Sequence, residues 1–181
     1  NVDGKVLPAQ LVDVFDRGEQ AQVPILAGFN EGEIRSLRFL LPPQPTDAEA
    51  YESEIRARYG DLADAMLQRY PGTDLDEAML ATTRDAMYGW TAERLVRNQS
   101  AFGQPSFLYY FNHGTPAADA MGLHAFHAGE IPYALGTADG APPNWPEIPA
   151  TDTETRLSDA MVAYWASFAR DGTPVAAGQP Q

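Results

Sequence analysis

Two short apolar runs along the chain favour buried strands. Val23-Pro-Ile-Leu-Ala27 ends at Gly28, and Ser106-Phe-Leu-Tyr-Tyr-Phe111 is rich in aromatic residues. Apolar runs without polar alternation are typical of strands that are covered on both faces, as in parallel sheets. A sheet of only two strands is marginal by itself. The pattern therefore predicts a small part of a larger parallel sheet.

Helical spacing dominates the rest of the chain. Thr46-Asp-Ala-Glu49 is a capping-box pattern and predicts a helix to about Tyr59. A short helix is expected over 61–70, and a long one over 74–99 with Gly89 as its weak point. The apolar stripe expected on the long helix consists of Leu75, Met79, Thr82, Ala86 and Trp90.

A second capping-box pattern lies near the end of the chain. Thr151-Asp-Thr-Glu154 predicts the start of a helix that runs to about Arg170, and Gly172 and Pro174 end it. The tail from residue 175 onward is expected to be frayed. With about five helices and two strands, the fold class is α/β, and the chain is mostly helical.

Charge and cysteine content exclude several classes of partner and of chemistry. The chain has 181 residues and a formal charge of 12 − 25 = −13, which disfavours nucleic acid and anionic membrane surfaces. It contains no cysteine, so disulfides and thiolate chemistry are excluded. Nothing near Asn1 resembles a secretion signal. The compartment stays unknown, with a secreted or periplasmic location favoured over a cytoplasmic one.

Candidate chemistry gathers between Gly122 and Gly136. This stretch holds two of the three histidines, His124 and His127, followed by Glu130, and its glycines predict a loop with one helical turn. Histidine is the side chain suited to proton transfer near neutral pH, although one of the two could simply hydrogen-bond its own loop. The third histidine, His113, lies elsewhere.

Carboxylates follow the first predicted strand. Glu31 and Glu33 come just after its carboxyl end, the edge where active sites collect in open α/β sheets. The simpler interpretation of either Glu31 or Glu33 is that its negative charge stabilises the start of a helix. A metal site made of His124, His127 and Glu130 is an alternative, but glycines interrupt the helix that it would need. We expect no metal and no cofactor.

Five stretches, in order, resemble the C-terminal part of the type-B carboxylesterases, the α/β-hydrolase family that includes para-nitrobenzyl esterases and cholinesterases. The matching segments are 2–8, 23–33, 107–111, 125–133 and 164–174. The resemblance implies that residues 1–181 form the C-terminal part of one α/β-hydrolase domain. About 42–104 would be a helical cap, and about 105–174 the last strand, the loop of the catalytic histidine and the C-terminal helix.

The resemblance also implies a Ser–Glu–His triad. Gly28-Phe-Asn-Glu-Gly-Glu33 matches the family's acid segment and makes Glu33 the acid, with Asn30 as a supporting residue. His127-Ala-Gly-Glu130 matches the histidine segment, so His127 is the base and Glu130 a supporting residue. Gly32 and Ile34 depart from the Asp and Gly that many relatives carry beside the acid. His124 has no assigned role.

The nucleophile is not in this chain, because none of its six serines stands in a Gly-x-Ser-x-Gly motif. The resemblance implies that the N-terminal part of the same protein supplies it and that the substrate is a small-molecule ester. Without a nucleophile this chain alone is expected to be inactive. An excised part would expose sheet edge and apolar surface, which predicts self-association. A non-catalytic interaction module of cholinesterase-like fold is the alternative function.

Pocket-lining or core positions are expected for Leu37, Phe39, Leu40 and Trp90, and core is favoured.

Overall fold

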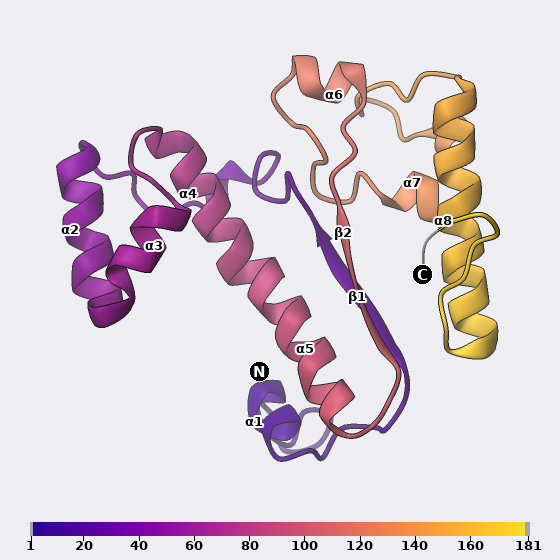
Figure 1. Cartoon of the computed structure of the whole chain (residues 1–181), viewed down its shortest axis with the longest axis horizontal. Coiled ribbons are helices and arrows are strands. Elements are labelled where there is room, and N and C mark those ends of the chain that lie inside the picture. Colours follow the sequence, from indigo (N-terminus) through magenta and orange to yellow (C-terminus); the bar gives the residue numbers. More distant parts are fainter. Residues whose placement is uncertain (1, 180–181) are drawn as a thin grey trace.

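The computed structural model describes residues 2–179, and its centre is a two-stranded parallel sheet (Figure 1). Strands β1 (Ile25–Asn30) and β2 (Ser106–Phe111) pair in register from Ile25 opposite Ser106 to Asn30 opposite Phe111. The prediction of two strands is confirmed, and β2 has the predicted bounds. The prediction that β1 ends at Gly28 is wrong. A Cβ at Gly28 would lie 2.3 Å from the Tyr109 carbonyl oxygen, so glycine lets the two strands approach each other.

Helices cover both faces of this sheet. Helix α5 (Trp90–Ala101) contacts both strands, and α8 (Asp152–Asp171) lies on the opposite side of the sheet (Figure 1). On the α8 side, Tyr109 meets Trp165 with ring centroids 5.1 Å apart. A short helix that the sequence did not predict, α1 (Leu11–Asp16), packs against α5.

The segment between the strands forms a separate helical lobe. It contains α2 (Ala48–Tyr59), a 3-10 turn (Gly60–Leu62), α3 (Ala63–Arg69) and α4 (Leu75–Arg84). A five-residue π-helix (Asp85–Gly89) joins α4 to α5, so the weak point expected at Gly89 is a change of helix type. The lobe has its own buried cluster of Tyr51, Ile55, Ala63, Ala78 and Met79.

The first capping prediction was displaced by one residue. Asp47, not Thr46, is the N-cap of α2, and its carboxylate accepts a hydrogen bond from the Ala50 backbone N–H at 2.8 Å. The Thr46 hydroxyl instead donates to the Asp47 side chain. Adjacent Thr and Asp are both good caps, so local sequence does not decide between them.

A second buried cluster lies between the sheet and α8. Its members are Phe111, Ala125, Tyr133 and Met161. Two short helices contribute to this side of the chain. Helix α6 (Pro116–Ala120) was not predicted, whereas α7 (Ile131–Ala134) is the expected turn after the histidines. Two 3-10 turns, Arg38–Leu40 and Ala138–Gly140, complete the described elements.

Helix α8 begins as predicted, with the Thr151 hydroxyl accepting from the Glu154 backbone N–H at 3.3 Å. It ends at Gly172, whose φ of 72° is the left-handed conformation that glycine adopts freely. The prediction of a frayed tail is wrong for its first residues, because the Val175 N–H donates to the Ser167 hydroxyl at 2.7 Å and Ala176 is buried. Residues 180 and 181 lie outside the described part.

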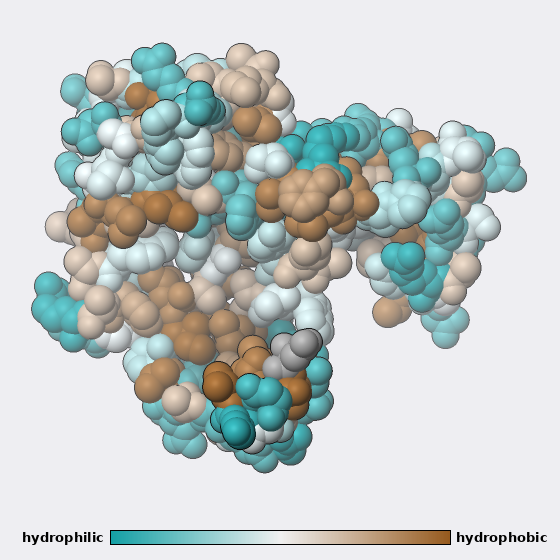
Figure 2. Space-filling model, turned by 180° about the vertical axis from the view of Figure 1, so that it is seen from behind, coloured by the Kyte–Doolittle hydropathy of each residue, from teal (hydrophilic) through white to brown (hydrophobic). Residues whose placement is uncertain are grey.

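Large apolar side chains are exposed at several places in the described chain, and apolar surface is visible across the middle of the face shown in Figure 2. Phe39 is 80% exposed and Trp90 51% exposed, so the preference for core at these two positions was wrong. Leu40 is also exposed, and Leu37 is half-buried. Within residues 2–179, no helix combines the length and apolar character needed to cross a bilayer.

Candidate active site

Glu33 lies in the turn that follows β1. The residue is 5% exposed, and its Oε1 accepts a hydrogen bond from the Asn30 backbone N–H at 2.9 Å. The turn is joined to the end of β2, since the Glu31 N–H donates to the Phe111 carbonyl at 2.8 Å. The sheet therefore fixes the backbone of the acid segment, and the segment's own N–H fixes the carboxylate.

The loop that carries His127 has an unusual backbone. His124 and Ala128 have φ values of 51° and 68°, which is the left-handed region that residues with a Cβ rarely adopt. Strained residues of this kind cluster at functional sites, where the surrounding structure holds them in place. Here one of the two, Ala128, directly follows His127, so the candidate base lies beside a strained backbone position.

Glu33 and His127 are brought together by the fold. His127 Nδ1 lies 2.5 Å from Glu33 Oε2, although 94 positions separate the two residues in sequence. The Glu33 side chain is 6% exposed and that of His127 44%. Within residues 2–179 no group hydrogen-bonds His127 Nε2. A buried carboxylate thus holds one ring nitrogen and leaves the other available for proton transfer.

Asn30 joins the acid segment to the histidine loop. Its side chain is fully buried, and Nδ2 donates to the Phe126 carbonyl at 2.9 Å and to Glu130 Oε2 at 2.5 Å. Glu33 and His127 form a dyad, and the two residues expected to support it, Asn30 and Glu130, are therefore in contact with each other. Glu130 also stands at the N-terminus of α7, where a negative charge is favourable.

Gly32 is where the two loops come closest. Its N–H donates to the Ala125 carbonyl at 2.8 Å, and a Cβ built on it would lie 2.4 Å from the Leu123 oxygen and 2.9 Å from the Ala125 oxygen. The histidine loop leaves no room for a side chain here. The departure from the family pattern at this position therefore suits the local packing.

We predict that Gly32→Ala pushes the acid segment and the histidine loop apart. Both contacted groups are backbone atoms, which cannot move aside alone, so the substitution should cost about 1–3 kcal/mol of unfolding free energy. Thermal or urea unfolding of this chain measures the cost. Gly140→Ala is the matched control, because no atom lies within 4 Å of its added Cβ. Equal stability of the two variants would contradict the prediction.

Sequence reasoning missed Tyr88, which contacts His127 directly. The two rings have centroids 5.6 Å apart and planes inclined by 52°. Tyr88 lies in the π-helix, a type of segment that is frequent at functional sites. Burial, and then the Glu33 charge, raises the pKa of Tyr88 above its usual value. Only Gly89 hinted at an irregularity here, because a π-helix has no simple sequence signature.

A second histidine–carboxylate pair lies beneath the histidine loop. His113 Nε2 is 2.9 Å from Glu154 Oε2, and the Tyr133 hydroxyl donates to the same oxygen at 2.6 Å. Burial and this contact raise the pKa of Tyr133. Glu154 was predicted to complete a capping box, but its carboxylate instead binds α7 and the segment after β2. Sequence spacing gave no signal for this pairing.

The two remaining members of the alternative metal site are directed to different partners. His124 Nδ1 lies 3.0 Å from Asp119 Oδ1, while Glu130 binds Asn30. Within residues 2–179, no group of three or more His, Asp or Glu side chains is placed to hold a metal ion. The structure therefore does not bring His124, His127 and Glu130 together as ligands.

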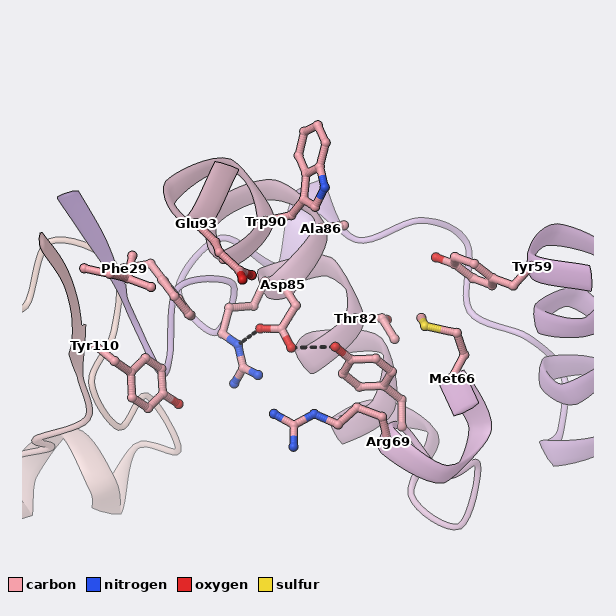
Figure 3. A pocket seen from close by; sticks show the side chains of 14 residues that line it. Phe29, Tyr59, Met66, Arg69, Thr82, Asp85, Ala86, Trp90, Glu93 and Tyr110 are labelled. Atoms are coloured by element: carbon pink, nitrogen blue, oxygen red, sulfur yellow. Dashed lines mark hydrogen bonds and ion pairs between the residues drawn. The ribbon is translucent and has the colours of Figure 1, made fainter. Parts of the chain in front are cut away.

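A cavity with a volume of about 760 Å³ lies between the helical lobe and the sheet (Figure 3). Trp90, Phe29 and Tyr110 line it, together with the ion pair of Arg84 and Asp85. Neither Glu33, His127 nor Tyr88 is among its lining residues. Cavity size alone therefore does not locate the candidate chemistry in this chain.

Comparison with protein families shows to which class this chain belongs. The model of the carboxylesterase family matches residues 1–181, and this chain belongs to that family. It is 31% identical to the fumonisin B1 esterase of Sphingopyxis macrogoltabida over 179 residues, 96% of this chain and 32% of that protein. It is 28% identical to the pyrethroid hydrolase Ces2e of Rattus norvegicus over 197 residues, 99% of this chain and 34% of that protein.

Solved structures give the same fold. A PNB esterase matches 98% of this chain and 36% of its own with a TM-score of 0.73 and 24% identity. A Geobacillus stearothermophilus carboxylesterase matches 99% of this chain and 38% of its own with a TM-score of 0.72 and 22% identity. The predicted fold class, part of an α/β-hydrolase, is confirmed. This chain spans about a third of the length of the relatives it matches.

Proposed function

We propose that residues 1–181 are part of a longer protein that hydrolyses carboxylic esters through an acyl-enzyme. Glu33 and His127 are two members of a Ser–Glu–His triad, and the serine comes from the N-terminal part. The observation that carries this proposal is the contact between His127 Nδ1 and the buried Glu33 carboxylate in a chain of the carboxylesterase family. An acid and a base matched in this way are what a serine nucleophile requires.

In the first step, His127 Nε2 takes the serine proton as the serine oxygen attacks the ester carbonyl carbon. The imidazolium then gives this proton to the leaving alcohol, and the acyl-enzyme forms. Water then attacks the acyl-enzyme in the same way. His127 takes a proton from the water, the carboxylic acid product leaves, and His127 returns the proton to the serine oxygen. Glu33 stays ionised throughout, orients the ring through Nδ1 and stabilises the imidazolium.

Hydrogen bonds to other groups engage several serines of this chain. Ser158 donates to the Tyr133 carbonyl at 3.1 Å, and Ser106 to the Gln104 carbonyl at 3.0 Å. No serine within residues 2–179 hydrogen-bonds His127. A serine from outside the chain is therefore the nucleophile that the proposal requires.

We assign the cap over the substrate to about 42–104, the region of the helical lobe and the π-helix. Tyr88 is the residue of this region whose ring contacts His127, so part of the ester is expected to lie beside it. The substrate is a small-molecule ester, and no finer class is proposed. The acidic charge of the chain favours neutral or cationic esters, an effect that salt weakens.

Isolated residues 1–181 are predicted to show no burst of acylation and no turnover of a para-nitrophenyl ester. The N-terminal two-thirds of the same protein, added as a separate chain or joined in one chain, should restore both. Stopped-flow release of nitrophenol measures the burst, with the His127→Asn variant of the joined chain as control. A burst from the isolated chain would contradict the proposal.

A further inference from the structure

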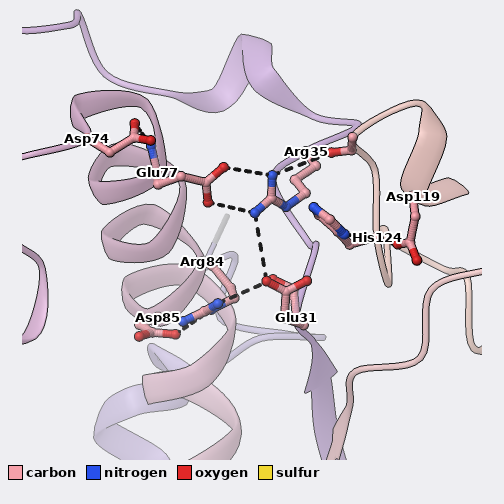
Figure 4. A network of polar contacts seen from close by, with 9 residues as sticks. Glu31, Arg35, Asp74, Glu77, Arg84, Asp85, Asp119 and His124 are labelled. Atoms are coloured by element: carbon pink, nitrogen blue, oxygen red, sulfur yellow. Dashed lines mark hydrogen bonds and ion pairs between the residues drawn. The ribbon is translucent and has the colours of Figure 1, made fainter.

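Arg35 links three segments around the dyad. Its side chain, 14% exposed, forms a two-point contact with Glu77 at 3.0 and 2.6 Å (Figure 4). It also lies 3.8 Å from Glu31 and donates to the Gly122 carbonyl at 3.4 Å. The acid segment, the first turn of α4 and the beginning of the histidine loop therefore meet at one guanidinium.

Helix α4 is joined at both ends to residues 31–35, the turn that contains Glu33. Arg35 binds its first turn, and Arg84 at its last residue donates to the Glu31 carbonyl at 3.3 Å (Figure 4). The π-helix that carries Tyr88 continues directly from this helix. The position of the acid segment relative to α4 therefore sets where the Tyr88 ring meets His127.

A neighbouring ion pair offers a comparison within the same structure. Arg38 stands in the 3-10 turn Arg38–Leu40, three residues after Arg35, and binds Asp76 in the same turn of α4 as Glu77. The Arg38 and Asp76 side chains are 49% and 46% exposed, and among residues 2–179 Arg38 forms no hydrogen bond or ion pair with the histidine loop. The difference between the two arginines is thus the third segment and the burial of Arg35.

We propose that Arg35 is a positioning residue for the reaction proposed above, on which this inference rests. It holds the acid segment, the histidine loop and α4 in the arrangement that aligns Glu33, His127 and Tyr88. The role depends on geometry more than on energy, because Glu77 is half exposed and such ion pairs contribute little to stability. A planar guanidinium can serve several acceptors at once, whereas a lysine ammonium cannot reproduce this two-point contact.

The kinetic test uses Arg35→Met, Arg35→Lys and the matched control Arg38→Met in the longer protein. Misalignment of the base affects the transition state more than ground-state binding, so Arg35→Met should lower kcat roughly tenfold with KM within about twofold. Arg35→Lys should recover part of the loss. Arg38→Met should leave both constants within about twofold of the parent. An equal fall in kcat for the two methionine variants would overturn the inference.

A second measurement does not depend on activity. Hydrogen exchange on the same variants reports the histidine loop through peptides that cover 122–127. Arg35→Met should raise exchange there about fivefold or more, since the loop loses one of its attachments, while Arg38→Met should not. Unchanged exchange in Arg35→Met overturns the inference. If the parent hydrolyses no ester but exchange rises as expected, the proposed function fails while the structural link through Arg35 stands.

Discussion

Replacing His127 by asparagine in the longer protein is expected to lower kcat by about 10⁴-fold or more, because triad members act as a unit. The substitution removes Nε2, the nitrogen to which no group within residues 2–179 hydrogen-bonds. With Nε2 the route for the serine proton is lost. Asparagine keeps one hydrogen-bond donor near Glu33, so the buried carboxylate need not be left without a partner. Steady-state hydrolysis of a para-nitrophenyl ester measures the loss.

His124→Asn is the matched control. His124 stands three positions earlier in the same loop and binds Asp119, not Glu33. Its replacement should leave kcat within about threefold of the parent, as expected for a side chain outside the proton-transfer route. Comparable losses for the two variants would show that the loop is fragile and would remove the special role of His127.

The second large effect is expected for Glu33→Gln, which should lower kcat by about 10⁴-fold, as for the acid of other serine triads. Both Glu33 oxygens act as acceptors, Oε1 for the Asn30 N–H and Oε2 facing His127 Nδ1. A glutamine has only one oxygen, so its amide donor must face either the Asn30 N–H or His127. The second outcome selects the wrong imidazole tautomer, and in both outcomes the neutral amide leaves the imidazolium without a counter-charge.

Glu31→Gln separates this effect from a general loss of charge beside the dyad. Glu31 is in the same turn, but its carboxylate lies near Arg35 and its side chain is 30% exposed. We expect kcat within about threefold of the parent, because the Glu31 contact with Arg35 is long, at 3.8 Å, and Arg35 keeps its two-point contact with Glu77. A loss for Glu31→Gln as large as that for Glu33→Gln would reassign the acid.

The sequence predicted the helices best where the local chemistry was unambiguous. Thr151 and Gly172 bound α8 as expected, because a hydroxyl cap and a left-handed glycine act within one turn. The acid and base segments could be identified only through the resemblance to a family. Their spacing of 94 residues carries no geometric information. The parallel pairing of β1 and β2, together with the hydrogen bonds of Asn30 and Gly32 to the histidine loop, brings the two segments together.

Features that depend on tertiary contacts were not predictable. The π-helix that places Tyr88 against His127 has no sequence pattern of its own. Glu154 looked like the second half of a capping box, yet its carboxylate binds the half-buried His113 and the buried Tyr133. The exposure of Phe39 and Trp90 contradicts a rule that holds for complete domains, in which large apolar residues are usually buried.

The central claim is that Glu33 and His127 activate a serine from outside residues 1–181. The most direct measurement labels the longer protein with a fluorophosphonate and locates the modified residue by peptide mass spectrometry. We expect one labelled serine, in a Gly-x-Ser-x-Gly peptide outside this chain, and loss of labelling in His127→Asn. A label on one of the six serines of this chain, or full labelling of His127→Asn, would contradict it.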